Sequence, residues 1–301
     1  MRALLACVCL IALCGCVPRE ITLTRSRLMM GHIPVNLSIR CPAKQKSAAI
    51  GAGDGAYALA QKIESEISEY QKDSQVSCLN QRAGKALCPL SQGTLDLLRR
   101  AEFYSRATDR AFDLRFASLT PKGASGEIET LESPPRGKLE RKDTRIGVGA
   151  IGKGWIIDQM VEYLKGQGFP EVLIDAGGHL RAVGGPWKIA IQVPEASPGI
   201  TTSVVEIHDE SWSTSGLYEQ GHHILDPRTR KTIDRRGSVT VRAPDLTTAD
   251  ALDTGFFVLG EEKSREYLAK FPGISMIWTD PDGATRTYPA GAATPAAQPV
   301  K

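Results

Sequence analysis

The sequence GVGAIGKGWIID, residues 147–158, decides how the chain is interpreted. It satisfies G-x-G-x-x-G, the pattern of a dinucleotide-binding turn, and it nearly matches the phosphate-binding loop G-x-x-x-x-G-K-[ST]. A phosphate-binding loop needs a Ser or Thr hydroxyl after the lysine, and Gly154 stands there instead. A dinucleotide-binding turn needs a strand directly before it, but the preceding GKLERKDTRI is charged and poor in strand-forming residues.

Two interpretations of this segment survive. Its small residues allow a backbone to approach a ligand closely, and the amide groups at the start of the following helix favour an anion. Lys153 adds a compact positive charge suited to a phosphate. The alternative is a tight turn before a helix that binds nothing, so the other segments of the chain have to decide.

Hydrophobic periodicity predicts both strands and helices. Strands are expected at residues 33–39, 172–175, 187–192 and 201–207, and helices at 56–70, 91–107, 155–165 and from Thr247 or Thr248 to residue 259. Ser91 is expected to be an N-cap, and Gly260 to end the last helix. Because strands and helices do not alternate strictly, we expect an α+β fold rather than a doubly wound parallel sheet.

The chain begins with MRALLACVCLIALCGC, which has the layout of a secretory signal. Its apolar run is too short to span a bilayer as a stable helix. Leu-x-Gly-Cys, ending at Cys16, resembles a bacterial lipobox, which implies that Cys16 carries lipid. Residues 1–15 are then a signal peptide and 16–26 a tether. A lipoprotein anchored on the periplasmic side of the outer or inner membrane of a Gram-negative bacterium is expected; a plain cleaved signal is the alternative.

The cysteines and the composition set further limits. Outside the cytoplasm disulfides are allowed, and Cys78 and Cys88 flank the turn-like NQRAGKAL, so a bond between them is an open possibility. The formal net charge of +3, the scattered basic residues and the aromatic content of 6% do not indicate a nucleic-acid surface. Residues 289–301 are rich in Pro and Ala and are expected to be disordered.

Two other segments contain residues with chemical potential. In residues 213–232, His223 can act as an acid or base near neutral pH, and Asp226 follows in a turn; a surface histidine with no role is the alternative. In TTADALDTGFFVLG, residues 247–260, Asp250, Asp253 and Thr254 lie on one helix face. Two carboxylates and a hydroxyl make an oxygen-rich site that suits Mg²⁺. Ordinary helix N-terminal acids are the alternative.

Together, and in this order, the segments resemble one family, the FAD:protein FMN transferases (ApbE family). The resemblance runs from about residue 27 to 281 and rests on Met30-Gly31 with Pro34-Val35, IESEISEYQKDSQVSCLN at 63–80, AFDLRFASL at 111–119, the GVGAIGKG loop, DAGGHL at 175–180, STSG, HHILDPRT and SVTVRAPDLTTADALDTGFFVLG. It implies an ApbE-type, T-fold-like domain of mixed, largely antiparallel sheets packed with helices, over residues 27–288.

The resemblance also implies a reaction and its site residues. A Ser or Thr hydroxyl of an acceptor flavoprotein attacks the FMN-side phosphorus of FAD beside Mg²⁺, and AMP leaves. Asp250 and Thr254 correspond to magnesium ligands, Gly152 to a carbonyl ligand, His223 to an essential histidine, Lys153 to a charge on the phosphates, and Asp226 to a residue that orders the His223 loop. Met30, Tyr70, Ala111, Phe112 and Asp113 correspond to regions lining the FAD site, together with Lys153 and His223.

Four residues depart from the pattern of the family. Gly147 replaces an Asp that contributes to FAD binding, and His179 replaces the Asp of Gly-Gly-Asp. Arg110 and Arg230 each stand where the family has Gly. The departures keep two alternatives open beside the transferase: a protein that binds FAD without catalysis, and an enzyme that hydrolyses FAD to FMN and AMP.

Overall fold

A central antiparallel sheet organises the chain, whose computed structural model describes residues 19–194, 200–216, 224–289 and 298–299. Its strand order is β1-β2-β6-β7-β10-β11-β12-β13, and every neighbouring pair is antiparallel. The strands are β1 (Glu20–Met29), β2 (Ile33–Pro42), β6 (Val172–Asp175), β7 (His179–Val183), β10 (Ser211–Gly216), β11 (Ser238–Ala243), β12 (Ser275–Thr279) and β13 (Thr285–Tyr288). The α+β prediction is confirmed.

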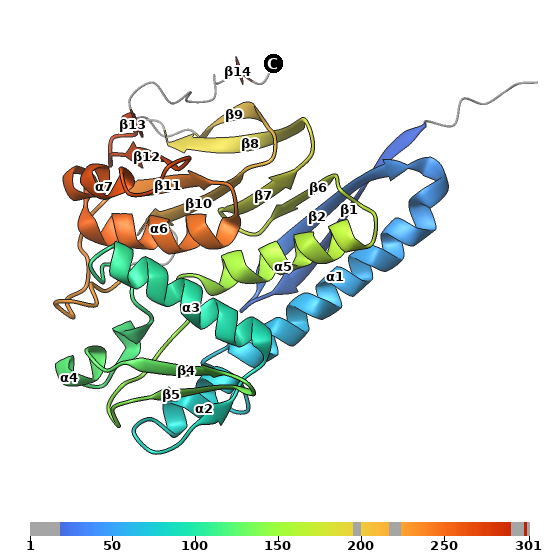
Figure 1. The fold of residues 1–301 in the computed structure, drawn as a ribbon. Helices are drawn as coiled ribbons and strands as arrows, with labels where there is room; N and C mark the ends of the chain where they lie inside the picture. Colours follow the sequence, from blue (N-terminus) through green and yellow to red (C-terminus); the bar gives the residue numbers. More distant parts are fainter. Residues whose placement is uncertain (1–18, 195–199, 217–223, 290–297, 300–301) are drawn as a thin grey trace, which may run out of the picture.

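Helices cover one face of this sheet. Figure 1 shows α1 (Lys46–Ile67), α5 (Gly152–Gly166) and α6 (Leu246–Leu259) side by side along it, with the short α7 (Glu261–Leu268) beside α6. α3 (Gln92–Ala107) lies on the side of these helices that faces away from the sheet. Nearly all of α6 is buried, because it lies between α5 and strands β10 and β11. Within the described ranges, no helix is both long and apolar enough to cross a membrane.

Two small sheets complete the fold. The hairpin of β8 (Trp187–Pro194) and β9 (Ile200–Ile207) buries Trp187 and Ile207 in a second apolar cluster with Trp212 of β10. The other sheet contains β3 (Cys88–Pro89), β5 (Pro135–Leu139) and β4 (Ile128–Glu132) and lies near α2 (Gln75–Gln81), α4 (Pro121–Ala124) and the turn η2 (Leu114–Ala117) (Figure 1). A disulfide joins Cys78 to Cys88 and ties α2 to β3.

The structure corrects several predicted boundaries. Residues 20–26, expected in a tether, form most of β1, since their backbone pairs with β2. Residues 298–299, expected in a disordered tail, form β14 (Gln298–Pro299) on the edge of β9. The last long helix begins earlier than expected, because the N-cap is Asp245, whose carboxylate accepts the Thr248 amide at 2.9 Å. Ser91 is the N-cap of α3, as predicted.

A buried carboxylate fixes α5 against the start of α6. Asp158 of α5 accepts hydrogen bonds from the amides of Leu246 (3.0 Å) and Thr247 (2.7 Å) and from the Thr247 hydroxyl. These amides belong to the first turn of α6 and have no partner inside the helix. Burial raises the pKa of Asp158, although the three hydrogen bonds oppose that rise. Asp158 therefore sets the position of α6 relative to α5.

Replacement of Asp158 by Ala should destabilise the fold by about 3 kcal/mol, because it leaves helix-end donors buried without an acceptor. The measurement is the free energy of unfolding in urea. Glu162→Ala, which removes an exposed carboxylate from the same helix, is the control and should change stability by less than about 0.5 kcal/mol. Equal losses in both variants would show that Asp158 does not hold α6.

Candidate functional site

The carboxylate of Asp250 is the meeting point of three segments. Asp250 lies in the first turns of α6 and is 2% exposed. Its Oδ2 accepts the Gly154 amide of α5 at 2.8 Å, and its Oδ1 lies 2.8 Å from Nε2 of His179 on β7. Nζ of Lys153 is 3.8 Å from the same Oδ1. The GVGAIGKG loop, DAGGHL and the α6 segment, well separated in sequence, thus form one cluster.

Close approach of the two helices requires a glycine at position 154. A Cβ there would clash with the Leu246 carbonyl and lie 2.9 Å from Cβ of Asp250. Because the side chain is a single hydrogen, the amide of Gly154 reaches the Asp250 carboxylate. Gly154 stands where a phosphate-binding loop has a Ser or Thr. The close packing of α5 against α6 explains why a glycine is found at this position.

The pKa values of Asp250 and Asp253 are shifted in opposite directions. Burial acts to raise the pKa of Asp250, but Lys153, His179 and the Gly154 amide outweigh it and hold that pKa below its ordinary value. Burial, with the neighbouring charge of Asp250, raises the pKa of Asp253. Two carboxylates this close repel each other unless a proton or a cation lies between them. The pair is therefore suited to binding a cation.

Hydroxyl groups complete the oxygen-rich side of the cluster. Ser213 of β10 donates to Oδ2 of Asp253 at 2.6 Å, and Thr254 donates to Oδ1 of the same residue at 3.1 Å. Oγ of Ser215 lies 3.2 Å from the Thr254 hydroxyl. These carboxylates and hydroxyls fit a hard divalent cation. His179, Asp250 and Asp253 each offer one ligand atom, and the three atoms lie within 4.8 Å of one another.

The cluster contains most of the residues predicted to handle phosphate and metal. Lys153, Asp250 and Thr254 lie in it, and Gly152 is the buried first residue of α5, two positions before the Gly154 amide. His179 was identified only as a departure from the family pattern. The Gly177-Gly178 turn was the signal that could have identified His179 as a site residue, since such a turn places the next side chain at the start of a strand.

The predicted flavin-lining residues have varied environments. Ala111 and Phe112 are each 1% exposed and belong to the core. The carboxylate of Asp113 is paired with Arg110 and Arg115, at 2.6 and 2.9 Å. The side chains of this segment are therefore committed to packing and ion pairs in this structure.

Met30 and Tyr70 both lie near the C-terminal end of α1. Met30 follows β1 with φ of 48°, and its amide donates to Glu64 of α1 at 3.3 Å. Tyr70 lies beyond the end of α1, not in the helix as predicted, and is 90% exposed. A large aromatic ring in that position is free to contact a ligand.

Asp226 makes its contacts within the turn that it begins. Its carboxylate makes a two-point contact with Arg228, with both distances 2.9 Å, and accepts the Arg228 amide at 2.9 Å. Burial opposes ionisation, but these contacts lower the pKa of Asp226 overall. His223 and the lipidation residue Cys16 lie outside the described residues, as does the predicted signal peptide.

The structure shows the surroundings of three of the departures. Arg110 and Arg230 both have φ of 61°, a conformation that glycine adopts most easily. The ion pair of Arg110 with Asp113 helps to hold it there. At Gly147, a Cβ would lie 2.8 Å from Oε1 of Glu69 and 2.9 Å from the Phe116 ring. The carboxylate of Glu69 has taken the space beside the loop.

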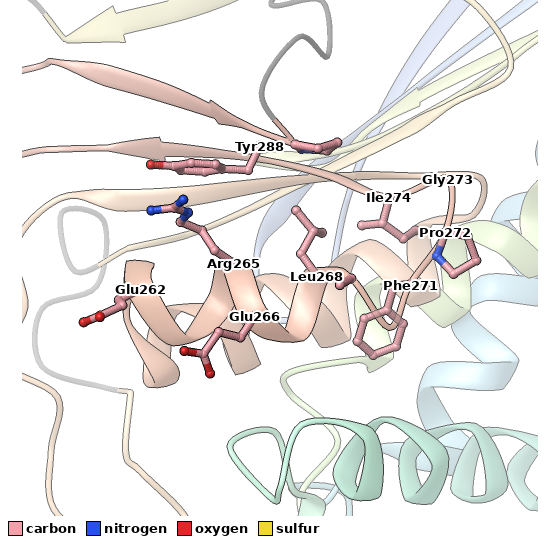
Figure 2. A pocket seen from close by; sticks show the side chains of 11 residues that line it. Glu262, Arg265, Glu266, Leu268, Phe271, Pro272, Gly273, Ile274 and Tyr288 are labelled. Atoms are coloured by element: carbon pink, nitrogen blue, oxygen red, sulfur yellow. The ribbon is translucent and has the colours of Figure 1, made fainter.

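A surface pocket lies away from this cluster. Figure 2 shows it between α7 and the end of β13, with Arg265, Leu268, Phe271 and Tyr288 around it, and its volume is about 710 Å³. None of the residues around Asp250 lines it. The cluster, where charges and metal-binding atoms converge, is the better candidate for chemistry.

Comparison with known proteins agrees with these motifs. The sequence profile of the ApbE family matches residues 32–278. The chain belongs to the ApbE family. It is 28% identical to the FAD:protein FMN transferase of Treponema pallidum (strain Nichols) over 336 aligned positions, covering 94% of this chain and 91% of that one. It is 30% identical to the FAD:protein FMN transferase of Vibrio cholerae, covering 74% and 78%.

Solved structures show the same fold for this ApbE-family chain. The flavin transferase ApbE from Vibrio cholerae matches with a TM-score of 0.75 at 24% identity, over 89% of this chain and 97% of that one. The apo flavinyl transferase ApbE of Pseudomonas stutzeri matches with a TM-score of 0.75 at 24% identity, over 91% and 98%. The predicted ApbE-type fold is thereby confirmed.

Restoring Asp at position 147 should destabilise this ApbE-family chain by about 1–3 kcal/mol, because the added atoms collide with Phe116 and place a carboxylate against Glu69. Thermal unfolding of Gly147→Asp measures this. The double variant Glu69→Ala/Gly147→Asp should recover much of the loss, since it removes the facing carboxylate. A single variant as stable as the parent would mean that Glu69 does not occupy that space.

Proposed function

We propose that the chain transfers the FMN part of FAD to a Ser or Thr hydroxyl of an extracytoplasmic acceptor flavoprotein and releases AMP. The observation that carries the proposal is the convergence of Lys153 and Asp250 at the N-terminus of α5. The names of the relatives in Treponema pallidum and Vibrio cholerae support the same activity. A positive helix end, a lysine and a buried carboxylate pair together suit a pyrophosphate with its counter-cation.

Phosphoryl transfer depends mainly on positioning and on neutralising charge. Lys153, at the start of α5, would bind the non-bridging oxygens of the pyrophosphate. Asp250 and Thr254, with the Gly152 carbonyl, would hold a divalent cation. When bound, that cation supplies positive charge to the same phosphate oxygens. The carboxylate of Asp253 accepts the Thr254 hydroxyl and adds a second negative charge beside the cation.

The bond changes follow from this arrangement. The acceptor oxygen forms a bond to the FMN-side phosphorus, and the bond from that phosphorus to the bridging oxygen breaks. The bridging oxygen leaves on AMP with the electron pair. His223 is proposed to accept the proton of the acceptor hydroxyl. Asp226 orders the loop that follows it through Arg228.

We also propose that the protein acts outside the cytoplasm, anchored by lipid on Cys16. The support is the signal-like sequence of residues 1–15 with its Leu-x-Gly-Cys ending. The Cys78–Cys88 disulfide is consistent with an oxidising compartment. β1 begins at Glu20, so only a few residues separate the proposed lipid from the folded domain.

The function is tested with the chain from Val17 onward, FAD, a divalent cation and a Thr-bearing acceptor domain. Covalent flavin on the acceptor is followed by gel fluorescence, and AMP is measured in solution. We expect covalent flavin that disappears with EDTA, and a loss of at least about 100-fold in Asp250→Asn. Asp282→Asn, in the exposed turn before β13, is the control and should retain full activity.

Three other outcomes would contradict the proposal. AMP and free FMN without covalent flavin, for every acceptor offered, would make the chain an FAD hydrolase. FAD binding without either product would make it a binding protein. Full activity in Asp250→Asn would move the cation and the pyrophosphate to another part of the chain.

A further inference from the structure

The His179 side chain faces oxygen atoms with both ring nitrogens. His179 is the first residue of β7, and its side chain is 9% exposed. Nε2 lies 2.8 Å from Oδ1 of Asp250, and Nδ1 lies 3.2 Å from the carbonyl oxygen of Gly177. Gly177 and Gly178, with φ of 54° and 82°, form the turn that brings this carbonyl beneath the ring.

A neutral imidazole has one N–H and one nitrogen with a free lone pair. If Nδ1–H donates to the Gly177 carbonyl, the lone pair of Nε2 points at the negatively charged oxygen of Asp250. A cation bound by both atoms removes that repulsion. Donation of the second ring nitrogen to a backbone carbonyl is also the usual arrangement of a metal-binding histidine, because it fixes the tautomer and the ring orientation.

The spacing of the ligand atoms agrees with one ion. Two ligand atoms at about 2.1 Å from an ion and about 90° apart are separated by about 3 Å. Nε2 of His179 and Oδ1 of Asp250 are 2.8 Å apart. A carboxylate oxygen of Asp253 completes a set of three atoms within 4.8 Å of one another.

We propose that His179, Asp250 and Asp253 form a mixed nitrogen and oxygen site that binds a divalent transition-metal ion in preference to Mg²⁺. Imidazole is a good ligand for Zn²⁺, Fe²⁺, Co²⁺ and Ni²⁺, whereas Mg²⁺ favours oxygen ligands and retains several waters. Three protein ligands leave positions open for phosphate oxygens. The inference deepens the proposed function. The binding of the ion does not rest on that function; only the role of the ion in flavin transfer does.

Ser213 and Lys153 contact the cluster from two different sides. Strand β7 pairs with β10 so that His179 lies opposite Ser213, whose hydroxyl donates to Asp253. Lys153 approaches Asp250 from the start of α5. Lys153 therefore lies on the α5 side of the cluster, where its charge would attract the substrate pyrophosphate. An ordinary His179–Asp250 ion pair without metal is the alternative that the test has to separate.

The first test measures metal binding to the untagged, EDTA-stripped full chain without FAD. Titration calorimetry with Zn²⁺, Co²⁺ and Mg²⁺ should show one tight site for the first two, at least about 100-fold stronger than for Mg²⁺. His179→Asp should weaken Zn²⁺ and Co²⁺ binding by at least about 10-fold while it preserves or strengthens Mg²⁺ binding. His208→Ala, an exposed histidine before β10, is the matched control and should bind like the parent.

A second measurement detects the coordinated nitrogen directly. Pulsed electron paramagnetic resonance of the Mn²⁺-loaded parent chain should show ¹⁴N coupling from a coordinated imidazole, lost in His179→Asp. Comparable affinities for Mg²⁺ and Zn²⁺, or no nitrogen coupling in the parent, would overturn the inference. Coupling that persists in His179→Asp would assign the nitrogen to another histidine and overturn it too. Because no FAD is present, failure of flavin transfer would leave these results unaffected, and successful transfer would not rescue them.

Discussion

The burial of the Asp250 carboxylate is the constraint on which the site depends. A buried charge is costly unless charges and hydrogen bonds surround it, and here the Gly154 amide, Lys153 and His179 provide them. The arrangement of α5 and α6 is reciprocal. Asp158 of α5 accepts the first amides of α6, and Asp250 of α6 accepts an amide from the first turn of α5. Each helix thus binds the N-terminus of the other through a carboxylate.

This reciprocity links stability to function. The same contact that fixes the two helices places a lysine, a positive helix end and two acidic side chains around one point. The central sheet supplies the rest of the cluster, since β7 carries His179 and β10 carries Ser213. A change that separates α5 from α6 would therefore disturb the charge arrangement even if it touched no residue of the cluster.

Local patterns made much of the fold predictable. Strand β6 has the expected bounds, and Ser91 caps α3, because alternation of apolar residues and capping depend on near neighbours. The order of the motifs also predicted that Lys153, Asp250 and Thr254 belong to one site. The N-cap Asp245 was missed, since Thr247 and Thr248 offered equally good local signals. The interaction of His179 with Asp250 depends on the pairing of β7 and β10, which no local pattern contains.

Two departures from the family pattern, Gly147 and Arg110, are accommodated by contacts that the sequence alone does not show. Glu69 fills the space beside Gly147, and the Arg110 ion pair with Asp113 supports a backbone conformation that favours glycine. These replacements are distributed over distant segments, so their compensation is visible only in three dimensions. The segments that correspond to the family's FAD-lining regions are therefore altered, while the helix pair that carries Lys153 and Asp250 is intact.

The most direct test of the account is a crystal structure of the chain with FAD and Mn²⁺, in which the anomalous scattering of manganese locates the ion. The account predicts an anomalous peak within about 2.5 Å of the Asp250 carboxylate and the pyrophosphate of FAD between that peak and Lys153. A manganese peak remote from Asp250, or FAD bound instead in the pocket beside Arg265 and Tyr288, would contradict it.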